Sequence, residues 1–478
     1  MFKFYILLFF ISIKIFSDPF HNINGFFGEK APGLSGAYTA ISDDPAGAYY
    51  NPAGLAFTYD NSISLSASNI TKIHKSYQNI VGPGQGYQRD SQNYIPNFFG
   101  VVKEYKSYRV AFSILNTLNE TFTRNDQVVN PVYVPLISNV RINNVESYNQ
   151  VQTGASIAKS ITDKFSVGAT LYYTYDTSSF TNANLIQFTN LQFQSGVVTD
   201  RRDTRGFLPI LGIMYMPTPK ISLGLSVRRQ FVTSGNRLFN LFTTSSFSNS
   251  NRILLQEGTD VANGGRLGST PIIYSPLNNR IPETSEVRAG IAIFPSKRLM
   301  AAFDTIYTSG FSRKENQYEM RFGGGARNYL LLQDSDVQEL KLYSTTNFAF
   351  GSEYFLTDNF ALRLGGFTNK ANTRNVSWLE SATLAYLRQT EPVETIQRNG
   401  DGQIDYKFGA LRNPIRNEYV NLIGGSFGFA WATSKASFGV TIVKEYGRGS
   451  SQIIETNPIQ TMVYDSTAIY VIVSSKSN

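Results

Sequence analysis

Cysteine is absent from this sequence of 478 residues, and histidine occurs only twice. Without cysteine the chain can form neither a disulfide framework nor a thiolate metal site, and two histidines cannot build a His/Cys metal cluster. The glycine-rich phosphate-binding run Gly-x4-Gly-Lys-Ser/Thr is also missing. We therefore expect that the protein is not an enzyme and has no catalytic residues, no metal and no cofactor.

Charge is sparse as well. Charged residues make up 16% of the chain, and although the formal net charge is +8, no dense run of Lys or Arg indicates a nucleic-acid patch. Aromatic residues reach 14%, a content that excludes a disordered chain. No nucleic-acid partner is expected.

Long apolar runs are missing after the first seventeen residues. Lys3 is followed by an almost unbroken apolar stretch to Phe16, which indicates a signal peptide over residues 1–17. Beyond it, no segment approaches the roughly 18 apolar residues of a membrane helix. The chain is therefore expected to be exported and to cross no membrane as a helix.

What the sequence does contain is a repeated pair of roughly ten-residue stretches of alternating hydrophobicity, joined by a short polar turn. From Phe165 to Tyr175, for example, apolar residues alternate with small or polar ones, so one face of a strand is apolar. With a lone first strand near 61–68 and a lone last strand near 465–475, about fourteen strands are expected, and single-chain outer-membrane barrels have an even number. The six hairpin turns fall at 104–107, 162–164, 217–220, 295–297, 357–359 and 432–435.

These short turns alternate with long polar segments rich in Asn, Ser and Thr. Short turns at one end and long loops at the other are typical of outer-membrane barrels, whereas a soluble β-sandwich needs no such asymmetry. The fold class expected is therefore all-β: a transmembrane antiparallel β-barrel in the cell outer membrane, in contact with its lipid. The expected loops are 69–93, 117–147, 177–204, 233–284, 310–344, 370–417 and 448–464.

The stretch before the first strand does not alternate. Asp44 followed by Pro45 suits the N-cap and first position of a helix, and Asn51 before Pro52 would stop that helix within two turns. The many small residues around them would allow close packing. We expect short helices here.

This stretch resembles the FadL family of outer-membrane long-chain fatty acid transporters. The matching runs are Ser35-Gly36-Ala37, Asp43-Asp44-Pro45-Ala46 and Tyr50-Asn51-Pro52-Ala53-Gly54-Leu55. The resemblance implies a small N-terminal plug, the hatch, over residues 18–60, inside a fourteen-stranded barrel formed by residues 61–478. The hatch residues that it implies are Gly33, Gly36, Asp43, Asp44, Pro45, Asn51, Pro52 and Ala53.

Strand parity predicts which charged side chains face the lumen. If Val110, Phe112 and Ile114 face lipid, Arg109 faces inward, because a charge facing lipid near the midplane costs about 2–4 kcal/mol. Asp304 and Glu353 are among the acids on the opposing wall. These arginines either form a structural ion-pair network or bind a carboxylate ligand. They are Arg109, Arg228, Arg288 and Arg363.

Two further features bear on ligand passage. The segments 177–204 and 233–284 carry more apolar residues than solvent-exposed loops usually do, and Phe239 and Phe242 are the candidates for ligand capture there. Pro96 and Pro209 lie inside expected strands, where each should mark a local break in the ladder. The family's side opening toward the membrane makes Pro96 the more interesting of the two.

The function that the resemblance implies is passive uptake of hydrophobic small molecules, with long-chain fatty acids first among them, by a monomer. The alternatives are a general porin, and a structural or secretion-associated barrel that carries a hatch without transporting fatty acids. A plug would block the open lumen that a porin needs, whereas an adhesin or structural barrel would need no plug.

Overall fold

The computed structural model describes most of the expected barrel. It covers residues 20–58, 61–79, 82–132, 137–191, 193–245, 282–314, 339–373, 418–451 and 460–477, with short pieces at 266–267, 272–273, 319–321, 329–331, 397–398 and 404–405. The expected signal peptide, residues 1–17, lies outside the described residues. Within them, no helix is long and apolar enough to span a membrane.

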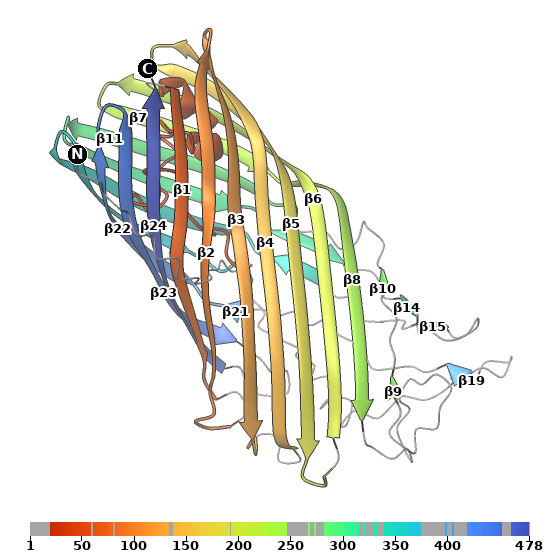
Figure 1. Ribbon diagram of the computed structural model, residues 1–478. Coiled ribbons are helices and arrows are strands. Elements are labelled where there is room, and N and C mark those ends of the chain that lie inside the picture. The colour runs from red at the N-terminus through yellow and green to blue at the C-terminus, as the bar shows by residue number, and fades with distance from the viewer. Residues whose placement is uncertain are drawn as a thin grey trace, which may run out of the picture.

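The long strands belong to one antiparallel sheet (Figure 1). They are β1 (Asn61–Tyr77), β2 (Tyr87–Tyr105), β3 (Tyr108–Val129), β4 (Ile137–Thr162), β5 (Phe165–Phe188), β6 (Phe193–Thr218), β7 (Ile221–Arg229), β8 (Phe231–Ser245), β11 (Ser285–Ser296), β12 (Leu299–Thr308), β17 (Thr345–Thr357), β18 (Phe360–Asn369), β22 (Leu422–Ala432), β23 (Ala436–Ser451) and β24 (Gln460–Ser477). The shorter elements are α1 (Gly47–Tyr50), η1 (Pro52–Phe57), β9 (Arg266–Leu267), β10 (Ile272–Ile273), β13 (Phe311–Lys314), β14 (Glu319–Arg321), β15 (Tyr329–Leu331), β16 (Glu339–Leu342), β19 (Gln397–Arg398), β20 (Ile404–Asp405) and β21 (Glu418–Tyr419).

The sheet closes into a barrel of 14 strands. β1 pairs with β2 on one side and with the last strand, β24, on the other, so no edge remains between the chain ends. β7 and β8 count as one strand position, because both pair with β6. The fold class and the strand number expected from the sequence are confirmed.

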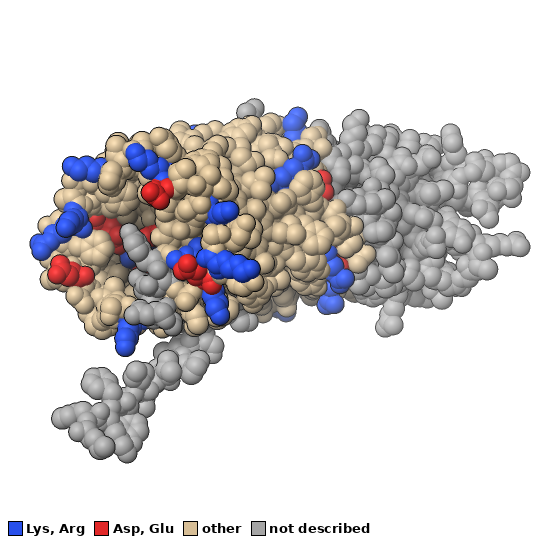
Figure 2. Space-filling view, turned by 90° about the horizontal axis from the view of Figure 1, so that it is seen from above, with Lys and Arg blue, Asp and Glu red and all other residues tan. Residues whose placement is uncertain are grey.

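The alternation expected for a membrane barrel is present on each face. In β7, Leu223, Leu225 and Val227 are exposed on the outside, while Ser222 and Ser226 are buried inside. Exposed apolar side chains cover the outer surface, and Lys and Arg side chains gather toward the two ends of the wall (Figure 2). An apolar outer band of this kind is the surface that lipid covers in a membrane-spanning barrel.

The strands run much further than the sequence predicted, and this prediction of the loops was wrong. Segments 69–93, 117–147 and 177–204 were expected to be loops but lie largely in β1 to β6, and β8 extends to Ser245. The reason is that strand pairing beyond the apolar band needs no hydrophobic alternation. Polar cross-strand bonds hold it instead, as where Asn139 Nδ2 donates to Gln187 Oε1 at 2.8 Å.

Both prolines lie at breaks, as the sequence predicted. Pro209 lies in β6 where the pairing passes from β7 to β8, around Gln230. Pro96 lies beside a register shift between β1 and β2. The missing N–H of each proline accounts for a ladder that stops or bulges there.

The N-terminal segment, residues 20–58, lies inside the barrel toward the end with the short turns, where Figure 1 draws it in red at the upper left. Its helices are short, as expected, but α1 begins at Gly47 rather than after Asp44. Asp44 Oδ1 accepts the N–H of Ala46 at 2.8 Å, so it shapes the turn before the helix instead of capping it. Asn51 does end α1 and caps η1 through Ala53 N–H.

Candidate functional site

The N-terminal segment and the inner wall approach each other at glycines. At five wall positions an added Cβ would come within 2.0 to 2.6 Å of an atom of the segment, closer than Cβ atoms pack. These close approaches explain why the inward faces of the strands carry glycine among small polar residues. The positions are Gly168, Gly212, Gly224, Gly351 and Gly365.

Wall hydroxyls bind the backbone carbonyls that the segment turns toward them. Ser222 Oγ donates to Ala40 O at 2.7 Å, and Thr170 Oγ1 donates to Ala48 O at 2.8 Å. Three serines do the same: Ser166 to Ala53 O, Ser226 to Tyr50 O and Ser426 to Gly33 O. Because a buried carbonyl without a partner is costly, these hydroxyls fix the segment's position in the lumen.

Asn51 joins the segment to itself and to the wall. Its Nδ2 donates to Thr39 O at 2.8 Å and to Ile213 O of β6 at 3.0 Å, while its Oδ1 accepts the N–H of Ala53 at 3.2 Å. Pro52, which follows, packs beside Gly168 and Gly212, and Pro45 lies against Gly100 of β2.

The other glycines of the segment serve backbone shape and close packing. Gly36 has φ +82° with the Phe26 ring against it, and Gly33 lies against the Arg363 side chain. Asp43 pairs with Lys30 at 2.6 Å. All eight residues that the family resemblance implied for the hatch thus make close contacts or hydrogen bonds, and their role as a hatch stays a prediction.

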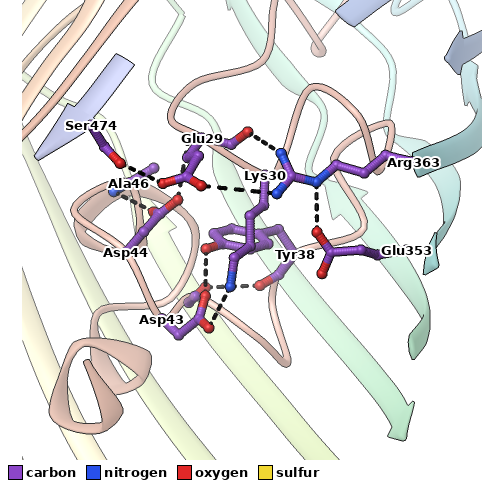
Figure 3. A network of polar contacts seen from close by, with 10 residues as sticks. Glu29, Lys30, Tyr38, Asp43, Asp44, Ala46, Glu353, Arg363 and Ser474 are labelled. Carbon is purple, nitrogen blue, oxygen red and sulfur yellow. Dashed lines mark hydrogen bonds and ion pairs between the residues drawn. The ribbon is translucent and has the colours of Figure 1, made fainter. Parts of the chain in front are cut away.

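A buried charged network ties the segment to three strands (Figure 3). Arg363 of β18 donates through Nε to Glu353 of β17 at 2.7 Å and through Nη1 to Glu29 O at 2.8 Å. Ser474 of β24 donates to the Glu29 carboxylate at 2.7 Å. On the segment's own side of the network, Tyr38 Oη donates to Asp43 Oδ1 at 2.9 Å.

The acids of this network differ in their proton affinity. Burial opposes ionisation of Glu29 and Asp43, but Arg363 next to Glu29 and Lys30 next to Asp43 outweigh it, so both pKa values are lowered. For Asp44 the balance is reversed: burial, together with the charges of Asp43 and Glu29, outweighs the charge of Lys30 and raises its pKa to about 6.

Comparison with solved structures identifies this architecture, although no family model and no curated protein matches the sequence. A FadL homologue from Pseudomonas aeruginosa aligns with a TM-score of 0.55 at 11% identity, over 97% of this chain and 99% of that one. The chain has the FadL fold. The toluene transporter TodX from Pseudomonas putida aligns with a TM-score of 0.57 at 12% identity over 95% of this chain and 98% of its own, and the monoaromatic hydrocarbon channel CymD with 0.52 at 14% over 96% and 99%.

Within this FadL fold, three of the four predicted arginines are buried in the lumen. Arg228 and Arg288 both contact Glu286, with Nε to Oε1 distances of 3.2 and 2.5 Å. Arg363 belongs to the network already described. Arg109 lies apart from them, beside the turn between β2 and β3, where it pairs with Glu104 at 2.9 Å.

Arg228 contacts Tyr49 as well as Glu286. Its Nη2 donates to Tyr49 O at 2.7 Å, and its guanidinium lies 4.3 Å from the centre of the Tyr49 ring. Its Nη1 is buried and has no hydrogen-bond partner among the described residues. Tyr49 itself is only partly buried.

Both acids predicted to lie opposite the arginines are buried. Glu353 pairs with Arg363, whereas Asp304 accepts the backbone N–H groups of Tyr38 and Thr39 at 3.0 and 2.9 Å. A sequence cannot show that contact, because its donors are backbone groups of a segment far away in the chain.

Sequence reasoning missed a second buried charged layer nearer the long-strand end. Lys75 of β1 pairs with Glu418 at 2.8 Å, and Arg89 of β2 pairs with Glu146 at 2.8 Å. The guanidinium of Arg89 lies 3.9 Å from the centre of the Phe122 ring. The parity of the expected first strand, continued past Ser68, would place Lys75 outward, and only the register shift between Ser68 and Ile70, which no sequence pattern marks, turns it inward.

The two predicted capture residues lie on a strand. Phe239 pairs with Asp200 and Phe242 with Val197 in the β6–β8 ladder. Their side chains lie outside the described part of the chain, so their role in capture stays a prediction.

The ladder between β2 and β3 ends part-way along the two strands, and we call this point the parting of β2 and β3. Pairing runs from Tyr105 opposite Tyr108 to Phe98 opposite Leu115, and beyond these residues β2 pairs only with β1, and β3 only with β4, in the described ladders. Each strand has a register shift at the point of parting, beside the buried residues Asn97 and Thr117. Asn97 Nδ2 donates to Phe26 O at 2.8 Å, which links the parting to the N-terminal segment.

Proposed function

We propose that this protein is a passive channel for hydrophobic small molecules across the outer membrane, with residues 18–60 acting as its hatch. The observation that carries the proposal is the fit between segment and wall: glycines and hydroxyls on strands around the barrel receive the segment closely. A lumen filled in this way does not suit a general porin. The parting of β2 and β3 supplies a candidate route from the lumen to the lipid.

We propose long-chain fatty acids as the first ligand class. Arg228 supports this choice, because a buried guanidinium N–H without a partner favours an anionic group. A carboxylate would accept from Nη1 once the Tyr49 ring moves aside, and its alkyl chain would lie against buried apolar residues such as Tyr172 and Leu208. Phe239 and Phe242 remain the proposed residues for capture at the outer end.

The monoaromatic hydrocarbons named for the structural neighbours are the second candidate, since they share the fold. They carry no charge, so they would gain nothing from Arg228. Substitution of the Arg228 side chain can therefore distinguish the two ligand classes.

Proteoliposomes test the channel itself. Protein in liposomes should admit a fluorescent fatty acid or toluene faster than empty liposomes, while planar bilayers show low ion conductance. High, ligand-independent conductance would indicate a porin, and neither activity would indicate a structural barrel.

Binding to the purified protein tests the ligand class. We expect Arg228→Met to weaken oleate binding about tenfold, equivalent to about 1.4 kcal/mol, and to leave toluene binding unchanged. Arg109→Met is the matched control, because Arg109 lies at the rim and pairs with Glu104. Equal oleate affinity for wild type and Arg228→Met would refute the carboxylate site but leave the channel proposal standing.

A further inference from the structure

Three arginines face outward at the border of the apolar band. On β6, exposed Leu211 and Ile213 set the outward parity, and Arg205 and Arg201 share it and are exposed. On β7, Arg229 follows the exposed Val227 with the same parity. We call Arg201, Arg205 and Arg229 the arginine patch.

Aromatic rings hold two of these guanidinium groups. The guanidinium carbon of Arg205 lies 5.7 Å from the centre of the Tyr175 ring, and the two residues are directly paired across β5 and β6. That of Arg229 lies 5.4 Å from the centre of the Phe231 ring. A guanidinium that lies over an aromatic ring contacts the ring through its own flat face. The N–H groups at the edge of the guanidinium therefore stay available to donate to an oxygen ligand.

The patch has no acid matched to it. Inside the barrel, each buried arginine described above contacts a carboxylate, whereas no carboxylate pairs with Arg201, Arg205 or Arg229 in the part of the chain that the structure describes. Asp203 lies between Arg201 and Arg205 on the strand and accepts from Asn236 Nδ2 at 3.2 Å. Three positive charges against one negative charge leave an excess that an external anion can neutralise.

The level of the patch indicates what that anion belongs to. At the level of Arg229 and below it, Leu171, Leu211 and Val227 form an exposed apolar surface suited to acyl chains. Above it the strands become polar and extend toward the end opposite the short turns, which is the extracellular end in outer-membrane barrels. Arg229 lies beside Pro209, so Arg205 is roughly 13 Å further along the wall at about 3.3 Å per residue.

We propose that the arginine patch binds the phosphate groups of a phosphorylated lipid of the outer leaflet, the chemistry of lipid A. Arg205 and Arg229 donate N–H bonds to phosphate oxygens, and the acyl chains cover the apolar surface below. Guanidinium matches phosphate bidentately, which explains arginine rather than lysine at these positions.

Lipid binding to the purified protein, measured by native mass spectrometry in detergent, tests this assignment. The variant is Arg205→Gln/Arg229→Gln. The control, Lys297→Gln/Lys435→Gln, removes the same number of exposed positive charges from the short-turn end. The probes are bisphosphorylated lipid A, lipid A stripped of its phosphates, and phosphatidylglycerol, and heat-modifiable migration on gels confirms that each barrel is folded.

We expect the patch variant to bind bisphosphorylated lipid A about tenfold more weakly than wild type, while the control stays within twofold. Dephosphorylated lipid A should bind wild type as weakly as intact lipid A binds the patch variant. Equal binding of lipid A by wild type and variant would overturn the proposal. Phosphatidylglycerol that binds as tightly as lipid A, with the same loss in the variant, would overturn the assignment to the outer leaflet.

Discussion

At the scale of single residues, wall glycines decide how closely the proposed hatch can sit. A Cβ at Gly224 would lie 2.2 Å from Thr39 O, a backbone atom that cannot swing away. We expect Gly224→Ala to destabilise the protein by about 1–3 kcal/mol through overpacking, seen as a lower midpoint for heat-induced unfolding on gels. Gly366→Ala is the control, because its nearest atom would be 3.8 Å away. Identical midpoints for the two variants would contradict this account of the wall.

Asp44 should make the N-terminal segment sensitive to pH. An unfolded aspartate has a pKa of about 3.9, and burial raises the pKa of Asp44 to about 6, so the folded state binds the proton more tightly. The stability from this group is fully present below pH 4 and is lost as the pH rises through 6. Glu29 and Asp43, whose pKa values are lowered, lose their contribution only at lower pH.

Amide hydrogen exchange over residues 29–46 measures this effect. From pH 7 to pH 5 we expect about 1.3 kcal/mol of added protection, or nearly tenfold slower exchange after correction for the intrinsic rate. Asp44→Asn should abolish this change, because its amide oxygen can still accept from Ala46 N–H but does not titrate. A variant that keeps the full pH dependence would assign the effect to another group.

Strand parity predicted well which way a side chain faces where the side chain contacts another strand. It placed Arg228, Arg288 and Arg363 inward, and all three are buried. It could not predict that Arg363 binds Glu29 O or that Asp304 binds the backbone of Tyr38, because the path of the N-terminal segment leaves no periodic signal in the sequence.

At the scale of elements, the sequence predicted turns better than strand lengths. Short turns between strands fall where polar clusters interrupt the alternation, as between Thr162 and Phe165. The outer halves of β4 and β5 were missed, because strands beyond the lipid need no apolar outward face and their Asn, Ser and Thr residues look like a loop. Polar ladders such as Thr181 opposite Thr199 hold them together.

The parting of β2 and β3 predicts different effects for the two strand prolines. Pro96→Val restores an N–H donor next to the parting, worth about 1 kcal/mol if it is used, and should reduce ligand uptake by proteoliposomes about fivefold. Pro209→Val is the matched control, because β5, β6 and β8 stay joined around that break. If both variants take up ligand like wild type, the proposed side route at this parting is wrong.

At the scale of the whole molecule, the number of expected strands predicted that the sheet closes into a barrel. Fourteen strands with short turns at one end predicted the barrel, since membrane-spanning sheets must leave no edge unpaired. The sequence also indicated an N-terminal plug through one short run of family-like residues. The wall surface that receives this segment was not predicted, because inward glycines and serines have no distinct pattern until the segment's path is known.

Removal of the segment should therefore turn the barrel into an open pore. Deleting residues 20–58 leaves every strand pairing of the wall intact, since those pairings join residues 61 and beyond. It also leaves Arg363 with Glu353, and Arg228 and Arg288 with Glu286, so each of these buried charges keeps a partner. We expect a barrel that still inserts but shows much higher ion conductance in planar bilayers and loses ligand-selective uptake, because water replaces the segment in the lumen. Wild type and Gly366→Ala serve as controls for folding and insertion, and unchanged conductance after deletion would mean that the lumen is blocked by something other than the hatch.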